Sequence, residues 1–309
     1  MANMELPKSI IITGATGFVG TNLQRWLGGR YDLIPYRLRH EVGRELRISK
    51  ADAVIHLAGK AHDTRNQVRG ETYDEANYEL TRQLYNAFLC SNAKCFIFLS
   101  SVKASADEVD GVLTEDDAPN PRTPYGKSKR KAEQYILDQP LPPDKRFYIL
   151  RPCMIHGPGN KGNLNILFKF VSLGIPYPLA AFNNRRSFLS VQNLCFVIGE
   201  ILSNELIPSG IYNVADDETL STAELVQLIG SVLHKPPRLW RVPRGVIRLL
   251  AKIGDRLKLP LTSERLQKLT GNYVVNNAKI RSAIGKPLPV SASDGMQQTL
   301  ATFNQSGNS

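Results

Sequence analysis

Short apolar runs alternate with segments of helical periodicity through the first half of the chain. The apolar runs have the length of β-strands and lie at Ser9–Thr13, Leu33–Arg37, Ala53–Leu57, Cys95–Ser100 and Phe147–Arg151. Helix-like stretches separate them at Thr21–Leu27, Tyr73–Cys90 and Tyr125–Leu137. Continuous apolar strands separated by helices are typical of a parallel sheet that is covered on both faces. The pattern therefore predicts an α/β fold with a doubly wound parallel sheet, which gathers its ligands at the carboxyl ends of its strands.

The pattern loosens after Arg151 into loops that contain proline and glycine, and it becomes regular again at Val191. A helix is expected at Val191–Leu202, a strand at Ile211–Ala215 and a helix at Thr222–Leu233, with several more helices to follow. Ser221 stands three residues before Glu224, a spacing that predicts a capping box. The second half is therefore expected to be mainly helical.

A glycine-rich turn follows the first strand. Gly14, Gly17 and Gly20 form a GxxGxxG pattern just before the helix-like Thr21–Leu27. Glycine permits a tight turn and a close backbone approach, while the N–H groups and the dipole at a helix start attract a pyrophosphate. A plain strand-to-helix turn is the alternative. We expect a dinucleotide to be bound by the residues of this turn: Gly14, Thr16, Gly17, Phe18, Val19 and Gly20.

The end of the second strand carries arginines where an acid would bind the 2′-hydroxyl of NAD. The segment reads Pro35-Tyr36-Arg37-Leu38-Arg39-His40, and its first following acid is Glu41. A guanidinium group suits a 2′-phosphate, so Arg37 or Arg39 favours NADP. Two solvated arginines at a strand end are the alternative.

Tyr125 and Lys129 stand four residues apart at the start of a helix, hence on one face. Acid–base chemistry near pH 7 needs a tyrosine pKa well below its ordinary value, and an ammonium group and an oxidised nicotinamide both act in that direction. Ser101, at the end of the preceding strand, can hydrogen-bond the same substrate oxygen. An exposed Tyr/Lys pair is the alternative for the pair alone; together with the glycine turn and Ser101, the pair predicts a proton-transfer site.

These residues carry a family resemblance that spans nearly the whole chain. The glycine turn, His56-Leu57-Ala58-Gly59, Asn77, Ser101, Tyr125-x-x-x-Lys129 and Leu150-Arg151-Pro152 together resemble an extended short-chain dehydrogenase/reductase of the nucleotide-sugar epimerase/dehydratase group. The resemblance implies a Rossmann-type fold with a smaller, mainly helical C-terminal substrate domain. It places the dinucleotide-binding domain at residues 1–160 plus about 187–220, and the substrate domain at about 161–186 plus 221–309.

The resemblance also implies roles for individual residues. Ser101, Tyr125 and Lys129 are expected to be catalytic, and Lys129 also to hold the nicotinamide ribose. The remaining cofactor contacts are expected from Leu57, Ala58, Gly59, Asn77, Ser100 and Pro152. His56 is expected to be a buried histidine with satisfied ring nitrogens rather than a chemical group.

The reaction and the substrate end follow from the same comparison. The family's 4,6-dehydratases carry an Asp-Glu pair after the serine position, whereas Ser101 is followed by Val102-Lys103-Ala104, so dehydration is not expected. A sugar diphosphate is expected to be held by Lys103, Asn163, Leu164, Arg186, Arg265 and Lys268. Asn163 has an alternative role as a helix N-cap.

The implied activity is NAD(P)-dependent oxidoreduction at C4 of a UDP-linked, N-acetylated hexose for surface polysaccharide. A 4-keto-sugar reductase is slightly favoured over a 4-epimerase, because the two arginines indicate an exchangeable NADP. A non-catalytic NAD(P)-binding protein of the same fold is the rival from another class. The expected partners are the nucleotide-sugar substrate and, as an assembly, a second copy in a homodimer; nucleic acid is not expected.

The net charge of +11 belongs to one segment of the chain. Residues 235–286 hold thirteen basic residues against two acids, which accounts for the whole excess. This placement argues against a general polyanion-binding protein and favours a local anion site or membrane-surface site. The hydrophobic fraction of 42% and the charged fraction of 22% are those of an ordinary globular protein.

A basic amphipathic helix is predicted within that segment, at Val246–Leu259. Its apolar positions fall on one face: Val246, Leu249, Leu250, Ile253 and Leu257. We favour a helix of the substrate domain whose apolar face packs on the core. The alternative is a helix that lies on an anionic membrane, in which case the substrate is a polyprenyl-diphosphate-linked sugar.

The cysteines and the long apolar segments of the chain bear on metal binding and on location. Cys90, Cys95, Cys153 and Cys195 show no metal-ligand spacing, so no metal is expected and all four are expected to be buried bystanders. No run is long and apolar enough to span a membrane, and the N-terminus does not resemble a signal peptide. The expected location is the cytoplasm, with the inner face of the membrane as the alternative.

Overall fold

A six-stranded parallel sheet forms the centre of the molecule. The computed structural model describes residues 9–38, 46–48, 50–60, 73–160, 162–257 and 261–306. The strand order is β2-β1-β3-β4-β6-β9, and every neighbouring pair is parallel. The strands are β1 (Ser9–Thr13), β2 (Asp32–Tyr36), β3 (Ala53–His56), β4 (Cys95–Leu99), β6 (Arg146–Pro152) and β9 (Gly210–Val214). The predicted doubly wound α/β fold is confirmed.

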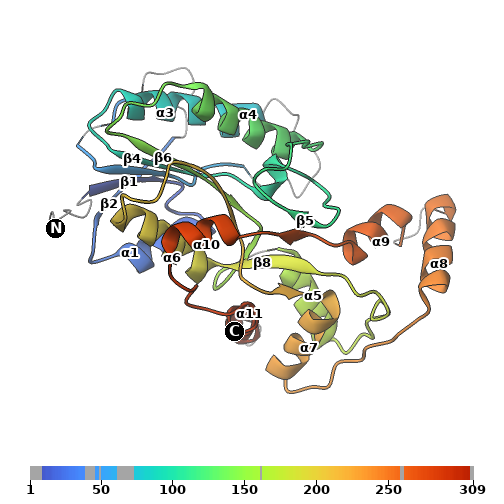
Figure 1. Ribbon diagram of the computed structural model, residues 1–309. Coiled ribbons are helices and arrows are strands. Elements are labelled where there is room, and N and C mark those ends of the chain that lie inside the picture. Colours follow the sequence, from blue (N-terminus) through green and yellow to red (C-terminus); the bar gives the residue numbers. More distant parts are fainter. Residues whose placement is uncertain are drawn as a thin grey trace.

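Helices cover both faces of this sheet (Figure 1). On one face lie α1 (Phe18–Leu27), α6 (Val191–Ser203) and α10 (Ala278–Ile284). On the other lie the π-helix η1 (Asp74–Glu79), α3 (Leu80–Leu89) and α4 (Pro124–Asp138). Side chains alternate along a strand, so Ile10 and Ile12 of β1 enter the first core cluster while Ile11 enters the second. Burial on both faces explains why the strands are continuous apolar runs.

A second, smaller body follows in the second half of the chain. Its three-stranded sheet has the order β10-β8-β7, built from β7 (Met154–His156), β8 (Arg186–Ser190) and β10 (Thr219–Leu220). The helices α5 (Asn163–Ser172), α7 (Thr222–Val232) and α11 (Ala292–Ser306) pack around a third core cluster that includes Phe168, Phe188 and Ile229. The exact division of the chain into two domains stays a prediction.

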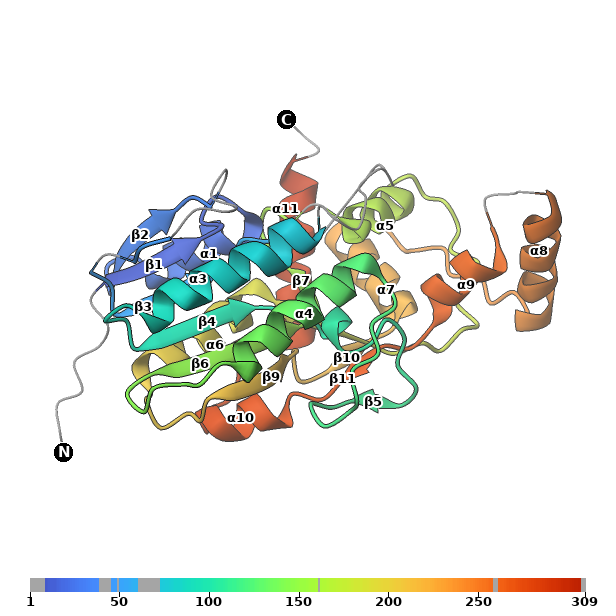
Figure 2. The same ribbon diagram turned by 90° about the horizontal axis from the view of Figure 1, so that it is seen from above.

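Short elements connect the two bodies. The 3-10 turn η2 (Val102–Ala104) follows β4, and β5 (Val112–Leu113) pairs with β11 (Val274–Val275). Two further helices, α8 (Arg244–Leu257) and α9 (Ser263–Thr270), lie at the end of the molecule remote from β2 (Figure 2). In the part of the chain that the structure describes, no helix is long and apolar enough to cross a membrane.

Several local predictions are confirmed and others are wrong. Ser221 and Glu224 form the expected capping box at the start of α7. The strands β7 and β8 and the helix α5 lie in the stretch that the sequence pattern left as loops. Cys90 is exposed rather than buried, because it ends α3 at the surface.

The favoured position for the apolar face of α8 is also wrong. The residues Ile247, Ala251 and Gly254 face the core, whereas the predicted apolar positions are exposed. We call these exposed positions the apolar stripe of α8: Val246, Leu249, Leu250, Ile253 and Leu257. The helix has apolar residues on two neighbouring faces, and only one of them packs against the protein. Of the predicted helix, Lys258 and Leu259 lie outside the described residues.

Candidate active site

The glycine turn is too tight for any larger residue. Gly14 has φ +71°, and a Cβ placed there would lie 2.7 Å from the backbone nitrogen of Ala58. A Cβ on Gly20 would overlap the carbonyl oxygen of Gly14. Gly17 is the N-cap of α1 and donates its N–H to the Gly14 carbonyl at 3.0 Å. Because these positions carry no side chain, a ligand can approach the backbone closely, as a pyrophosphate-binding turn requires.

The start of α1 suits an anion. The helix has no side-chain cap on its first N–H groups and no acidic residue in its first turn. Thr16 is exposed at the turn, while Phe18 and Val19 pack against the first core cluster. The predicted contacts thus surround a helix N-terminus whose dipole is not neutralised by the protein.

Gly59 lies against two candidate cofactor residues. A Cβ at Gly59 would lie 2.9 Å from Oδ1 of Asn77 and 3.0 Å from Nζ of Lys129. Buried Asn77 accepts the N–H of Lys60 at 2.8 Å and donates to the Ser128 hydroxyl at 3.0 Å. Asn77 therefore ties the loop after β3 to α4. Leu57 and Ala58 begin that loop, and their N–H groups are both held by Thr13.

Lys129 is buried at the centre of the site. Its ammonium group donates to the carbonyl of Leu99 at 2.9 Å and stands 4.7 Å from the ring centroid of Phe98. Desolvation lowers the pKa of Lys129 to about 8, although the carboxylate of Glu133 raises it. Lys129 is thus a strongly desolvated amine beside Gly59.

Ser101 and Tyr125 come together as predicted from their spacing along the chain. Burial raises the pKa of Tyr125, and the hydrogen bond that its hydroxyl shares with Ser101 lowers it. Ser101 also caps η2 by accepting the N–H of Lys103 at 3.2 Å. Thr123 caps α4, which fixes Tyr125 in the first turn. The net effect is a raised pKa of Tyr125, so the expected lowering is not produced by the protein chain alone.

A buried ion pair lies directly beneath these residues. Arg151 binds Glu133 through two contacts, Nε to Oε1 at 2.9 Å and Nη2 to Oε2 at 2.7 Å. Ser100 donates its hydroxyl to the same carboxylate at 2.6 Å. The Ser100 side chain therefore faces the core, and only its backbone is left for the predicted cofactor contact. Sequence reasoning did not identify Glu133, although it stands four residues after Lys129 on one helix face.

His56 is a core residue, as expected. Its Nδ1 lies 2.7 Å from the Thr13 hydroxyl and its Nε2 lies 2.8 Å from the Thr81 hydroxyl. Desolvation, followed by the nearby charge of Lys129, lowers the pKa of His56 to about 3. The imidazole is therefore neutral and fully partnered, which suits packing and not proton transfer.

The remaining predicted cofactor residues lie at strand ends. Pro152 ends β6 and pairs in register with Val214, at the same edge of the sheet as the glycine turn. Arg37 follows the last residue of β2 and is exposed. Arg39 lies outside the described residues.

The predicted substrate residues do not all gather at one place. Lys103 donates to the Asp107 carbonyl at 2.7 Å and lies 4.3 Å from the ring centroid of Tyr273; burial lowers its pKa. Arg186 donates from Nε to the Gly271 carbonyl at 3.1 Å and from Nη2 to the Lys268 carbonyl. Burial lowers the pKa of Arg186 too. These two cations flank the end of α9.

Asn163 and Leu164 differ from the expected pattern. Gly162 is the N-cap of α5 and Asn163 is its first residue, so the alternative role of Asn163 as the cap is wrong. Asn163 is exposed, whereas Leu164 is buried in the third core cluster. The predicted Asn-Leu pair thus divides into one surface residue and one core residue.

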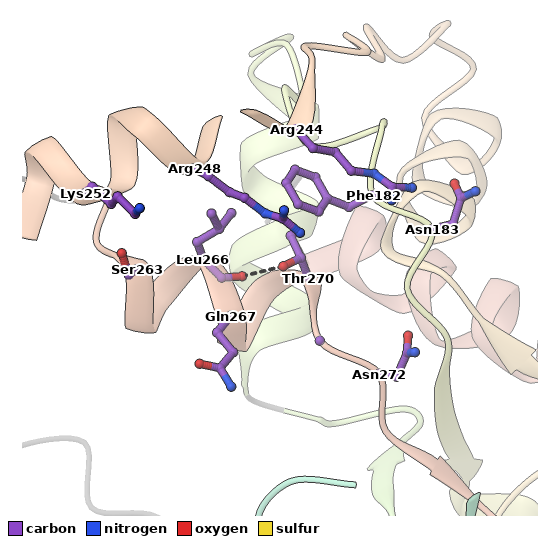
Figure 3. Close-up of a pocket in the computed structure, with 11 residues that line it drawn as sticks. Phe182, Asn183, Arg244, Arg248, Lys252, Ser263, Leu266, Gln267, Thr270 and Asn272 are labelled. Atoms are coloured by element: carbon purple, nitrogen blue, oxygen red, sulfur yellow. Dashed lines mark hydrogen bonds between the residues drawn. The ribbon is translucent and has the colours of Figure 1, made fainter. Parts of the chain in front are cut away.

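A cavity of about 500 Å³ lies between α8, α9 and the loop before β8 (Figure 3). Arg244 and Arg248 extend over Phe182 and toward Thr270, and Lys252 adds a third cation to the lining. Arg265 and Lys268, named from the sequence, are exposed on α9 outside this lining, and Lys268 pairs with Glu264 at 2.5 Å. Arg244, Arg248 and Lys252 were not named as site residues from the sequence, because their four-residue spacing indicates one side of a helix and only the packing of α8 and α9 makes them a cavity lining.

Within the described residues, no group of histidine, cysteine, aspartate and glutamate side chains is arranged to hold a metal ion.

The sequence matches a protein-family model and is similar to several named enzymes. The model of the NAD dependent epimerase/dehydratase family matches residues 10–215. A UDP-glucose 4-epimerase of Vibrio cholerae is 30% identical over 98% of both chains. An N-acetyl-α-D-glucosaminyl-diphospho-ditrans,octacis-undecaprenol 4-epimerase of Escherichia coli O157:H7 is 27% identical over 94% of both chains.

Comparison with solved structures gives the same fold. The Bordetella bronchiseptica enzyme WbmG, solved in complex with NAD and UDP, superposes with a TM-score of 0.74 at 18% identity. The match covers 98% of this chain and 96% of that one. The fold is therefore similar over essentially the full length of both chains.

Proposed function

The chain belongs to the NAD dependent epimerase/dehydratase family, and on that premise we propose that it interconverts a hydroxyl and a ketone at C4 of a UDP-linked hexose. The observation that carries the proposal is the contact between Ser101 and Tyr125 beside buried Lys129, at the edge of the sheet where the glycine turn opens. The family and its relatives support a nicotinamide-dependent nucleotide-sugar epimerase or reductase. The C4 position and the UDP carrier are part of the proposal.

The residues of the site fit a nicotinamide dinucleotide. Gly14, Gly17 and Gly20 leave space that a Cβ would fill, and the uncapped start of α1 supplies N–H groups and a favourable dipole for the pyrophosphate. When bound, the nicotinamide supplies the acceptor or donor of hydride.

The side chains of the site then handle the proton. In the oxidation the Tyr125 phenolate takes the proton from the C4 hydroxyl, and in the reduction the Tyr125 hydroxyl returns it to the ketone oxygen, while Ser101 hydrogen-bonds the same oxygen and fixes its position. Lys129, held by the Leu99 carbonyl, places a positive charge beneath the tyrosine when protonated, and its lowered pKa makes this charge depend on pH. Lys103, at the position of the second acid of the dehydratases, offers no carboxylate for elimination.

Two forms of this chemistry share the site. An epimerase keeps its cofactor through two hydride transfers, whereas a reductase exchanges it after one. We place the epimerase first, because both of the most similar curated relatives described above are 4-epimerases. The reductase is the second form, favoured by the exposed Arg37 at the end of β2, which suits the 2′-phosphate of NADP.

Product analysis by NMR separates the two forms. Purified protein is incubated with UDP-glucose, UDP-N-acetylglucosamine and a UDP-4-keto sugar, each with and without added NADPH or NADH. Interconversion of C4 epimers without added cofactor supports the epimerase, and stoichiometric loss of NADPH with the keto sugar supports the reductase. A protein that binds cofactor and turns over none of these substrates contradicts the proposal and supports a non-catalytic binding protein.

A lipid-linked substrate is the second candidate. It is favoured by α8, which lines the cationic cavity with Arg244, Arg248 and Lys252 and carries an exposed apolar stripe on another face. Such a helix suits a diphosphate that is joined to a polyprenyl chain. The same NMR assay, run with undecaprenyl-diphosphate-N-acetylglucosamine in detergent against UDP-N-acetylglucosamine, decides by the ratio of kcat/KM for the two substrates.

A further inference from the structure

The apolar stripe of α8 is an exposed hydrophobic surface on a charged helix. Its side chains lie along one side of the helix, with Leu249 and Leu250 adjacent and the others three or four residues apart, and their exposed fractions run from 40% at Ile253 to 66% at Leu257. The neighbouring face, formed by Ile247, Ala251 and Gly254, already anchors the helix to the protein. The stripe is therefore not needed to hold α8 in place. A run of five large apolar residues on one surface marks an interaction site more often than chance exposure.

The position of α8 leaves this side open. The helix lies at one end of the molecule, beyond α9 and away from the six-stranded sheet in both views (Figures 1 and 2). The exposed Trp240 stands four residues before the helix begins, with 57% of its surface accessible. Tryptophan is enriched where a protein meets the interface of a bilayer.

Positive charge borders the stripe. Arg244, Arg248, Lys252 and Arg256 recur every four residues and wind around the helix from the cavity side, where the first three line the cavity, to the stripe, beside which Arg256 lies. None of the four has an acidic partner within the described residues. The acid of the helix, Asp255, is engaged by the N–H and hydroxyl of Ser263. The surface is thus apolar along one side and cationic along the next.

An apolar stripe next to a basic side chain indicates one kind of binding partner best. We propose that α8 docks the protein on an anionic lipid bilayer, with the apolar stripe in the headgroup–acyl boundary and Arg256, the basic side chain beside the stripe, on lipid phosphates. A second copy of this chain would meet the stripe with the same excess of positive charge, which opposes such a dimer. An anionic leaflet supplies both the apolar layer and the opposite charge. The proposal is independent of the proposed activity, since binding to lipid needs no turnover.

Vesicle flotation of the full-length protein tests the proposal. We expect the protein to float with vesicles of equal parts phosphatidylglycerol and phosphatidylcholine, and not with phosphatidylcholine alone. The double variant Leu249→Ser/Leu257→Ser should bind at least about ten-fold more weakly, because both side chains leave the acyl boundary. Arg256→Ala, outside the cavity lining, should weaken binding about five-fold. Fluorescence of Trp240 should shift to shorter wavelength on the anionic vesicles.

The matched control is Leu206→Ser. Leu206 is 86% exposed but lies in the turn between α6 and β9, so its loss should leave flotation unchanged. Failure of the wild-type protein to float with anionic vesicles overturns the proposal. Flotation that the Leu249→Ser/Leu257→Ser variant retains in full also overturns it, because the lipid contact then lies elsewhere. A dimer in solution that this variant dissociates overturns it as well, by assigning the stripe to a second copy.

Discussion

The buried residues beneath the proposed active site and the residues of α8 differ in whether their side chains have partners within the protein. Beneath the site, Glu133, Arg151 and Lys129 are almost fully buried, and each has hydrogen-bond partners within the protein. On α8, the five apolar side chains of the stripe are exposed, and three basic side chains line an open cavity. A group that is buried with its partner contributes to folding and positioning, whereas an exposed group contributes to encounters with other molecules. The two regions should therefore respond to substitution in opposite ways.

Removal of the Tyr125 hydroxyl should produce the largest effect on activity. Tyr125→Phe is expected to lower kcat by about 10²- to 10⁴-fold, because it deletes the proton donor while leaving the ring in place. Cofactor affinity, measured by fluorescence titration with NADH or NADPH, should change little. Tyr135→Phe is the matched control on the same helix, since its hydroxyl bonds Asn86 away from the site. Full activity in Tyr125→Phe would remove Tyr125 from the chemistry.

Breaking the buried ion pair should produce the largest effect on stability. Glu133→Gln leaves the Arg151 guanidinium buried without its counter-charge, which is expected to cost about 3–5 kcal/mol in free energy of unfolding. Urea denaturation measures this cost. The control is Glu205→Gln, which removes a half-exposed pair with Arg146 and should cost less than about 1 kcal/mol. Equal costs at the two positions would contradict the contrast between buried and exposed charge.

The buried amine of Lys129 predicts a dependence of stability on pH. Its pKa is about 8 in the folded protein and ordinary, near 10.4, in the unfolded chain. Between these values the unfolded chain binds more protons, so stability should rise with pH relative to Lys129→Met, by about 3 kcal/mol across the window. Below pH 8 the difference between the two proteins should stay constant. Urea denaturation of both proteins from pH 7 to 10.5 checks the slope, and parallel curves would contradict it.

Substitution in the apolar stripe should produce the smallest effect on stability. Leu249→Ser is expected to change the free energy of unfolding by no more than about 0.5 kcal/mol, because Leu249 is already 59% exposed. Ile247→Ala, two residues earlier but buried, should cost about 2–5 kcal/mol. A large destabilisation by Leu249→Ser would show that the stripe supports the fold instead of facing a partner.

The six-stranded sheet and the glycine turn could be predicted because the local sequence pattern there directly reflects the burial and the backbone geometry of the folded protein. Burial on both faces makes Ile10, Ile11 and Ile12 apolar in succession, and the glycines of the turn are fixed by backbone geometry alone. The contact between Ser101 and Tyr125 followed from adjacent strand and helix ends. The inward turn of Ser100 toward Glu133 did not, because it depends on which charges meet across the sheet.

The second body was less predictable. Its strands β7 and β10 are too short to show an alternating pattern, and β8 carries Arg186 and Ser187 among its five residues. The amphipathic pattern of α8 identified an apolar side but not what that side meets, so the core was the wrong choice. The cavity cations are brought together by the packing of α8 against α9, which no local pattern records.

The carboxylate of Glu133 is shared by the hydroxyl of Ser100 and the guanidinium of Arg151. Positions 133 and 151 are therefore expected to change together among related chains: loss of the acid leaves a buried cation unpaired, and loss of the cation leaves a buried acid unpaired. Ser100 after β4, Glu133 in α4 and Arg151 in β6 should therefore show correlated substitutions among homologues.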